Sequence, residues 1–236
     1  MLLVNIRIES NRRLKYRYYI WSKAMVKVQR IKCGNGNCYI IEEKENAVLV
    51  DTARQKYCDK VLLACRKVNI KLIILTHTHM DHCQNAAYIS KELNIPIAIC
   101  KADEELIKNN MLQTLYARTL AGKLVLFFSE KSFYHDKIPE FTPKIYLQDG
   151  DTLEDFGISA KILGLPGHTN GSIGIDFGKE GIFVGDALMN MFYPTVSMLY
   201  HNYEQMLESA RKISELGERI VYFGHGKPKK NRIWVK

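Results

Sequence analysis

His77-Thr78-His79-Met80-Asp81-His82 is the stretch that decides how this chain is interpreted. It places three imidazoles and one carboxylate within a single short segment, although the whole chain of 236 residues has only seven histidines. Neutral imidazole and carboxylate are the ligands that zinc and similar divalent metals take. A polar loop with chance histidines would rarely gather so many of these groups. The stretch therefore predicts a metal site built from His77, His79, Asp81 and His82.

Three further metal-type side chains, His168, Asp186 and His225, occur later in the chain. Each follows a short apolar run that is typical of a buried strand, and each has a glycine directly before it. Glycine allows the backbone to turn sharply and to approach another group closely. The pattern indicates that several strand ends deliver metal ligands. The two remaining histidines, His135 and His201, lie in polar or aromatic segments and are interpreted as surface or packing residues.

The ordered set His-x-His-x-Asp-His, Gly-His, Gly-Asp and Gly-His-Gly resembles the metallo-beta-lactamase-fold metallo-hydrolase superfamily, and within it the glyoxalase II and lactonase-like branch. The resemblance covers about residues 25 to 228, and Asp51 in Leu49-Val50-Asp51-Thr52 matches a family segment as well. It implies a fold of class α/β. The expected architecture is a four-layer αββα sandwich of two mixed β-sheets flanked by helices, with the metals at one edge between the sheets.

The resemblance also implies a role for each matched residue. Seven positions match metal ligands of the family: His77, His79 and His168 for one ion, Asp81, His82 and His225 for the other, and Asp186 as the bridge between them. The residue matching Asp51 supports the metal loop by contacting a ligand rather than the metal.

The ligand set predicts a dinuclear metal-dependent hydrolase. We expect a metal-bridging hydroxide to attack a small ester, thioester or lactone, with Asp81 as the catalytic group that orients the hydroxide or carries a proton. Asp186 stands where the cysteine-ligand beta-lactamases carry Cys, which disfavours antibiotic hydrolysis as the main activity. The expected cofactors are two divalent metal ions, zinc first, with iron or manganese as alternatives because ligand type does not separate them. Two other functions stay open: a metal-dependent phosphodiesterase or nuclease, and an iron-dependent oxidoreductase of the same fold.

The composition is that of an ordinary globular protein, with 47% hydrophobic and 25% charged residues. No apolar run approaches the ~20 residues needed to cross a bilayer, and no signal peptide is recognisable. The six cysteines form no Cys-x-x-Cys pair and are interpreted as reduced thiols. We therefore expect a cytoplasmic protein with no membrane partner.

The net charge of +9 favours anionic partners through long-range attraction. A small anionic substrate satisfies this as well as nucleic acid does. No alternation of aromatic and basic residues indicates a platform for stacked bases, so nucleic acid is the less favoured partner. The sequence indicates no oligomeric state.

The chain divides into residues 1 to 24, an N-terminal extension or added edge element, and residues 25 to 236, the metallo-beta-lactamase-fold domain. Within the latter, residues 101 to 143 are an apolar, mostly helical insert near the active site, which either roofs the pocket or simply covers the sheet. Elsewhere the hydrophobic pattern predicts helices over Thr52–Asn69, Cys83–Leu93 and Asn202–Leu216, and strands over Cys38–Glu42, Ala47–Val50, Lys71–Thr76, Ile97–Ile99, Ile173–Phe177 and Ile182–Val184.

Overall fold

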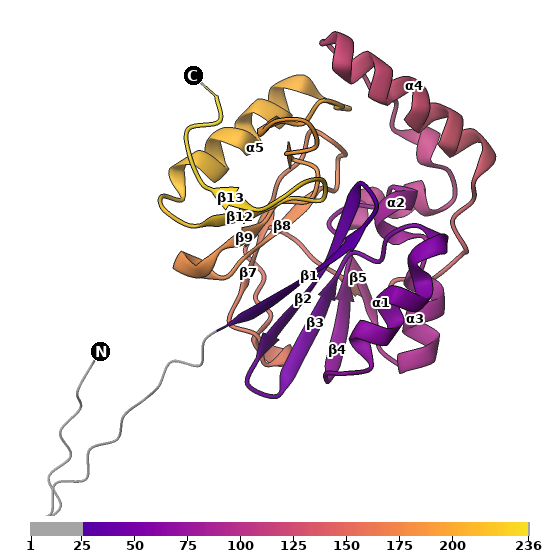
Figure 1. The fold of residues 1–236 in the computed structure, drawn as a ribbon, viewed down its shortest axis with the longest axis vertical. Coiled ribbons are helices and arrows are strands. Elements are labelled where there is room, and N and C mark those ends of the chain that lie inside the picture. Colours follow the sequence, from indigo (N-terminus) through magenta and orange to yellow (C-terminus); the bar gives the residue numbers. More distant parts are fainter. Residues whose placement is uncertain (1–25, 236) are drawn as a thin grey trace, which may run out of the picture.

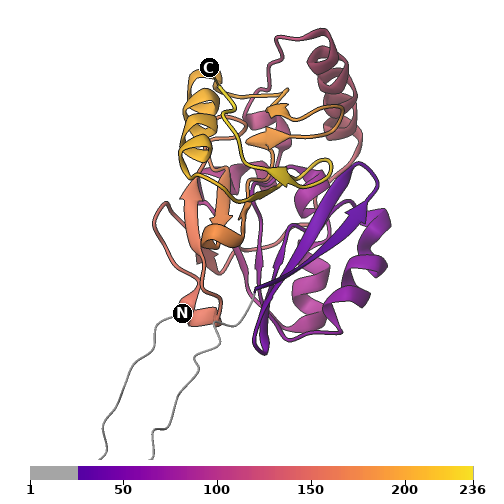
Figure 2. The same ribbon diagram turned by 60° about the vertical axis from the view of Figure 1, so that its left-hand side comes forward.

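The computed structural model of the protein describes residues 26 to 235. The predicted extension over residues 1 to 24 lies outside the described residues. Figures 1 and 2 show two sheets that face each other, with helices on their outer sides.

The N-terminal sheet is mixed and has the strand order β1-β2-β3-β4-β5-β6. The first three strands are antiparallel neighbours, and each later strand pairs in parallel with the one before it. The middle strands are almost continuously apolar because both faces of the sheet are covered. The strands are β1 (Lys27–Cys33), β2 (Gly36–Glu43), β3 (Asn46–Val50), β4 (Ile70–Ile74), β5 (Ile97–Ile99) and β6 (Ile145–Tyr146).

The C-terminal sheet is also mixed, with the order β13-β12-β9-β8-β7. Only β12 and β9 pair in parallel, and the other neighbours are antiparallel. Its strands are β7 (Lys161–Gly164), β8 (Ile173–Asp176), β9 (Ile182–Phe183), β12 (Ile220–Tyr222) and β13 (Lys229–Lys230). Between β9 and β12 along the chain, β10 (Leu188–Met189) and β11 (Thr195–Val196) form a separate two-stranded antiparallel ribbon.

Three apolar cores separate four layers. The first lies between the N-terminal sheet and the helices α1 (Cys58–Cys65) and α3 (Ala86–Leu93). The second fills the space between the two sheets, and the third lies under α5 (Tyr203–Glu215) on the outer face of the C-terminal sheet. The predicted αββα sandwich of two mixed sheets is therefore confirmed.

The predicted helix Asn202–Leu216 is present as α5, and residues at both of its ends stabilise the termini. The side chain of Asn202 accepts a hydrogen bond from the backbone N–H of Gln205 and caps the first turn. Gly217, with φ of +76°, ends the helix in the left-handed conformation that glycine adopts without strain. Met206, Ala210 and Ile213 face the core from one side of this helix.

Two predicted helices are shorter than their apolar pattern indicated. Asp51 and Ala53 have φ of +59° and +62°, so the chain after β3 turns before the short 3-10 helix Gln55–Tyr57 and α1 begin. The predicted helix Cys83–Leu93 is divided, because α2 (Met80–Cys83) ends before Asn85. The Asn85 amide donates to the carbonyls of residues 52, 53 and 54, which ties this break to the turn after β3.

The segment from residue 101 to 143 contains the 3-10 helices Lys101–Ile107 and Asn110–Leu112 and the helix α4 (Leu120–His135). Gly122 is the buried residue of α4, and Leu124, Phe127 and Phe128 are all more than half exposed. Figure 1 shows α4 standing out from the sandwich at the edge near α2. Residues 26 to 235 contain no helix that is long and apolar enough to cross a membrane.

Candidate metal centre

Four loops, each leaving the end of a strand, bring the seven predicted ligand side chains to one edge of the sandwich. The loops follow β4, β7, β9 and β12. Backbone contacts join the two sheets at this edge, where Ile173 N donates to Thr76 O at 2.8 Å and Gly36 bridges to His225. The candidate ligand atoms form three groups, each with its atoms within 4.8 Å of one another: His77, His79 and His168; His77, His82 and Asp186; and Asp81, His82 and His225.

The Asp186 carboxylate lies at the centre of this cluster. Its Oδ1 is 3.5 Å from Nε2 of His82, and its Oδ2 is 3.2 Å from Nε2 of His225 and 3.8 Å from Nε2 of His168. Oδ2 of Asp81 lies 3.4 Å from the same His225 nitrogen. Two ligand atoms each 2.1 Å from a tetrahedral ion are about 3.4 Å apart. Most of these separations thus suit a shared cation better than a direct hydrogen bond, which is closer to 2.9 Å.

Several inward-facing atoms have no hydrogen-bond partner among residues 26 to 235. They are Nε2 of His77, Nε2 of His82 and Oδ1 of Asp186, and Nε2 of His79 is unpaired as well. A buried polar atom without a partner costs free energy, so native proteins rarely leave one. The three inward-facing atoms fit a site that is completed by metal ions, and His79 faces the same site with its Nδ1, which lies 3.0 Å from Nε2 of His168.

The outer nitrogens of the imidazoles are held by the protein. Nδ1 of His82 lies 2.8 Å from Asp51, Nδ1 of His168 lies 2.8 Å from the carbonyl of Leu199, and Nδ1 of His225 lies 3.1 Å from the carbonyl of Asn35. A partner on one ring nitrogen fixes the tautomer and the ring orientation, and so presents the other nitrogen to a metal.

Asp51 lies outside the three ligand groups but contacts His82, one of their members. Its carboxylate accepts hydrogen bonds from Thr76 N at 2.8 Å and from Thr76 Oγ1 at 2.9 Å, in addition to the contact with His82. The positive φ of Asp51 is uncommon for a residue other than glycine. The three partners of the carboxylate hold the residue in that conformation.

Burial keeps part of the cluster in the neutral form that binds metals. It lowers the pKa of His79 to about 3, lowers that of His77 well below its ordinary range, and lowers that of His168. Because a metal needs the unprotonated nitrogen, these three imidazoles are ready to bind at neutral pH.

The carboxylates and the other two imidazoles shift one another's pKa values. Burial by itself raises the pKa of Asp186, but His225 and His82 outweigh it and bring that pKa down to about 2. Burial likewise lowers the pKa of His82, but Asp51 and Asp186 outweigh it and raise the value to about 9. The pKa of His225 is also raised by Asp186 and Asp81 against the effect of burial. His82 and His225 therefore hold protons at neutral pH in the metal-free protein, and bound metal ions would take the place of those protons.

Gly224 is required by close packing around the cluster. A Cβ at this position would lie 2.3 Å from Oδ1 of Asp186 and 2.6 Å from Cε1 of His82. Gly185, with φ of +51°, has a similar constraint, since its Cβ would lie 2.6 Å from Thr76 Oγ1. These are two of the glycines that the sequence places directly before candidate ligands.

Asp103 is a site residue that the sequence analysis missed. Its buried carboxylate accepts hydrogen bonds from Thr78 N, Thr169 Oγ1 and Gly171 N, at 3.3, 2.8 and 2.7 Å. It therefore joins the loop after His77 to the loop after His168. Burial raises the pKa of Asp103 to about 6, although its hydrogen bonds lower it.

Asn110 holds the same turn from the other side. Its side-chain oxygen accepts from Met80 N at 2.9 Å, and its amide donates to Thr78 O and Leu106 O at 2.8 Å each. Neither Asp103 nor Asn110 belongs to a local motif, and no sequence signal marks either as a neighbour of the histidines.

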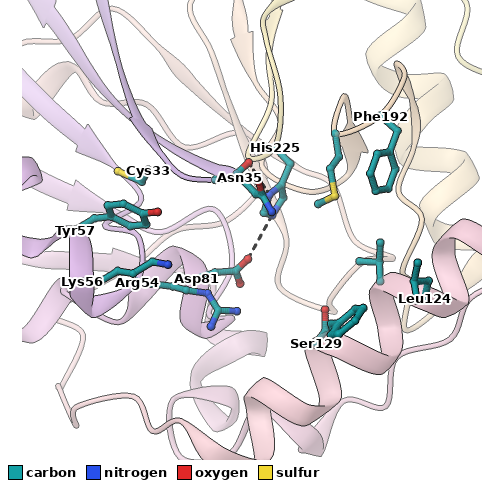
Figure 3. A pocket seen from close by; sticks show the side chains of 14 residues that line it. Cys33, Asn35, Arg54, Lys56, Tyr57, Asp81, Leu124, Ser129, Phe192 and His225 are labelled. Carbon is teal, nitrogen blue, oxygen red and sulfur yellow. Dashed lines mark hydrogen bonds and ion pairs between the residues drawn. The ribbon is translucent and has the colours of Figure 1, made fainter.

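A cavity of about 390 Å³ opens onto Asp81 and His225. Figure 3 shows Lys56 and Arg54 on one side of it and Leu124 of α4 on the other. Arg54 is held by Ser132 Oγ at 2.6 Å and Asp136 at 3.3 Å, both from the end of α4. Further apolar side chains complete the wall: Val125, Phe128, Met191 and Phe192.

The remaining histidines and the cysteines lie outside the three ligand groups. Nδ1 of His201 is 3.0 Å from Thr114 O, and the ring of His135 packs edge-on against Tyr134. All six cysteines carry free thiols. The Cys83 thiol is buried and donates to Thr78 O, so it packs behind the metal loop.

Comparison with known proteins agrees with this architecture. A sequence model of the metallo-beta-lactamase superfamily matches residues 31–225. The chain is 25% identical over 197 residues to the hydroxyacylglutathione hydrolase GloC of Haemophilus influenzae, covering 80% of this chain and 85% of that protein. It is 28% identical over 211 residues to the hydroxyacylglutathione hydrolase of Pelagibacter ubique, covering 87% of this chain and 73% of that protein.

Solved structures show the same fold. The BLEG-1 B3 metallo-beta-lactamase superposes with a TM-score of 0.67 at 22% identity, over 87% of this chain and 94% of that chain. The protein TTHA1623 in a di-iron-bound form superposes with a TM-score of 0.64 at 22% identity, over 88% of this chain and 96% of that chain.

Proposed function

The chain belongs to the metallo-beta-lactamase superfamily, as its motif predicted, and from this premise we propose that it is a metal-dependent hydrolase that uses two divalent ions to cleave a small thioester, ester or lactone. The observation that carries the proposal is the ligand cluster. Seven candidate ligand side chains converge, with unpaired inward atoms and separations around Asp186 of 3.2 to 3.8 Å.

We assign His77, His79 and His168 to one ion, Asp81, His82 and His225 to the other, and Asp186 to both. When bound, two such ions would lower the pKa of water toward neutrality and polarise the carbonyl under attack. Zinc is our first choice, because imidazole and carboxylate are ordinary zinc ligands. Iron and manganese take the same ligands, and one of the structural relatives is known in a di-iron-bound form.

Asp81 is our candidate for the catalytic carboxylate. Its side chain is 25% exposed and lines the cavity, whereas that of Asp186 is 5% exposed. Burial raises the pKa of Asp81, but the hydrogen bond with His225 and the charge of His82 outweigh it, and the pKa lies well below its ordinary value. The ionised carboxylate can accept a hydrogen bond from the attacking water and orient it toward the substrate.

The cavity supports a small substrate with an anionic group and an apolar group. Arg54 and Lys56 provide positive charge on one wall, and Leu124, Val125 and Phe128 of α4 provide an apolar wall. We propose that residues 101 to 143 act as a roof over the pocket. Two observations favour this role: the α4 side chains in the cavity wall, and Phe133, whose ring centroid lies 5.0 Å from that of His79.

The test is the hydrolytic activity of His79→Ala. We expect the purified protein to hydrolyse at least one member of a panel of thioester, lactone, phosphodiester and cephalosporin substrates, and the variant to lose that activity while its circular dichroism spectrum is unchanged. The matched control is His201→Ala, which removes a histidine outside the cluster. Turnover retained by His79→Ala would contradict the proposal, and so would equal losses in both variants.

A further inference from the structure

A second cavity, of about 410 Å³, adjoins the one above the candidate metal centre. Four cationic side chains line it: Arg30, Lys32, Lys227 and Lys229. No acidic side chain of the described residues lines this cavity. We call it the basic groove. We propose that the basic groove binds a phosphate group on the leaving group of the substrate, the thiol or alcohol that hydrolysis releases. This inference rests on the proposed function.

The two halves of the basic groove come from different sheets. Arg30 and Lys32 are two positions apart on β1 and therefore point to the same face of that strand. Val28 lies on this face as well and packs in the core between the sheets. Arg30 and Lys32 therefore lie on the side of β1 that faces the C-terminal sheet. That sheet contributes Lys227 and Lys229, which follow His225 in the chain.

Among residues 26 to 235, no acidic side chain forms a salt bridge with these cations. Lys27, at the start of β1, lies opposite Glu42 and forms a salt bridge with it at 3.2 Å. The residues opposite Arg30 and Lys32 are Tyr39 and Asn37, which carry no charge. Within residues 26 to 235, none of the four cationic side chains of the basic groove forms a salt bridge. Their charge is thus available to a ligand.

The guanidinium of Arg30 is held in place. Its Nε donates to Asn37 Oδ1 at 2.8 Å, and the Asn37 amide donates to Gly226 O at 2.8 Å and Phe223 O at 3.0 Å. Asn37 is buried. The terminal nitrogens of Arg30 make no hydrogen bond within the described part of the chain. A fixed arginine with free terminal N–H groups suits the geometry of a phosphate.

The basic groove is continuous with the reaction site. Asn35 and Met191 line both cavities. The carbonyl of Asn35 also contacts Nδ1 of His225 at 3.1 Å, and Gly226, the next residue, lines the basic groove. A substrate whose scissile bond lies at the metal centre would therefore extend into the basic groove on this side.

The chemistry of the basic groove separates two kinds of leaving group. Two relatives are named for substrates that contain glutathione, a thiol that carries an ammonium group beside its carboxylates. The described residues that line the basic groove include no acidic side chain to bind an ammonium. A phosphorylated thiol or alcohol carries only negative charge at this end, and four cations attract it. In the reaction, water adds its oxygen to the acyl carbon, the C–S or C–O bond breaks, and the phosphate-bearing leaving group takes up the proton.

The test compares two thioesters that differ only in one phosphate, S-acetylpantetheine and S-acetyl-4′-phosphopantetheine. We expect kcat/KM of the metal-loaded enzyme to be about tenfold or more higher for the phosphorylated thioester, the effect of a few charge-assisted hydrogen bonds. In Lys32→Ala/Lys227→Ala, which keeps Arg30 and Lys229, this preference should fall by about threefold or more, while hydrolysis of the unphosphorylated thioester is unchanged. The control Lys71→Ala/Lys179→Ala removes the same charge from exposed positions outside the basic groove and should keep the preference.

Each result has one meaning. Equal kcat/KM for the two thioesters, or a preference that both double variants lose alike, would overturn the inference and leave the proposed hydrolase standing. If neither thioester is hydrolysed, calorimetry would compare the affinities of the protein for free phosphopantetheine and for free pantetheine. A preference for the phosphorylated thiol that Lys32→Ala/Lys227→Ala alone weakens would support phosphate binding by the basic groove even though the proposed hydrolysis had failed. Equal affinities for the two thiols would overturn phosphate binding by the basic groove. Salt-sensitive binding of single-stranded RNA to the basic groove without the thioester preference would also overturn it, in favour of a polynucleotide ligand.

Discussion

Asp51 and His82 are joined by a 2.8 Å contact between a carboxylate oxygen and Nδ1 of the imidazole, and both side chains are almost completely buried. The contact occupies the outer nitrogen of His82 and leaves Nε2 facing the cluster, with no hydrogen-bond partner in the part of the chain that the structure describes. We propose that Asp51 thereby controls which nitrogen of His82 is offered to a metal, although it is not itself one of the candidate ligands.

Replacing Asp51 with alanine should weaken metal binding without removing a ligand. The expected loss in affinity is about 10- to 100-fold, the range found for partners that orient metal-bound histidines. Competition with a chromophoric chelator measures it. Asp149→Ala is a suitable control, because Asp149 is an exposed carboxylate bound to Lys212, away from the centre. Unchanged metal affinity in Asp51→Ala would contradict the orienting role.

Gly224→Ala should abolish metal binding to the second ion site and reduce hydrolysis by about 100-fold or more. The reason is steric, since the new Cβ would lie within 2.6 Å of both Asp186 and His82. Metal content and kcat are the measurements, with circular dichroism to show that the sandwich is intact. Gly178→Ala is the control, because φ of +76° strains its backbone but the new Cβ meets nothing within 4 Å, whereas Gly224 has no positive φ and its Cβ meets the cluster. Gly178→Ala should keep its metals, and a similar loss of metal in both variants would contradict the steric explanation.

Asp103→Asn should loosen the two loops that carry His77 and His168. Each carboxylate oxygen of Asp103 accepts hydrogen bonds, and an amide NH₂ in place of one oxygen would face donors. We expect a lower melting temperature in the metal-free protein and about tenfold weaker metal binding. Thermal unfolding with and without metal separates these effects. A variant that unfolds earlier but binds metal normally would show that Asp103 supports the fold alone.

Metal binding should strengthen as the pH rises from about 6 to about 9. The carboxylates around His82 raise its pKa from 6.5 to about 9, so the metal-free protein holds a proton there that a metal must displace. Because this folded-state pKa is raised, the proton stabilises the metal-free fold below pH 6.5, and that stabilisation is lost as the pH rises through 9. The metal-free protein should therefore lose this contribution over the range in which metal affinity increases.

Calorimetric titrations with metal in buffers of different ionisation enthalpy would count the protons released. We expect at least one proton per chain at pH 7, and up to about tenfold higher affinity per pH unit for each proton released. Proton-free binding with a flat pH profile would show that His82 and His225 are not ligands.

The resemblance to a known family implied the layered fold, and the local apolar patterns predicted most of its strands and the helix α5. The predicted helix Asn202–Leu216 is present as α5, with Asn202 and Leu216 as its capping residues. The break between α2 and α3 could not be predicted in this way, because Asn85 bonds to carbonyls more than thirty positions earlier in the chain. A run of apolar residues does not record such a contact.

The candidate ligands were identifiable for a chemical reason, since histidine and aspartate in a tight motif have few other uses. Asp103 and Asn110 were not, because a carboxylate or an amide in an irregular segment is ordinary until its partners are known. The cations of the basic groove share this property. Arg30 and Lys227 are far apart in the chain, and only the packing of one sheet against the other brings them to the same cavity.

The number of metal ions bound per chain tests the central claim most directly. We would measure it by elemental analysis of the protein saturated with metal and freed of excess, for the wild type and for Asp186→Asn. The account predicts about two ions per chain in the wild type, and one or none in the variant, with hydrolysis lost. A wild type that binds at most one ion, or a variant that binds as many ions as the wild type, would contradict it.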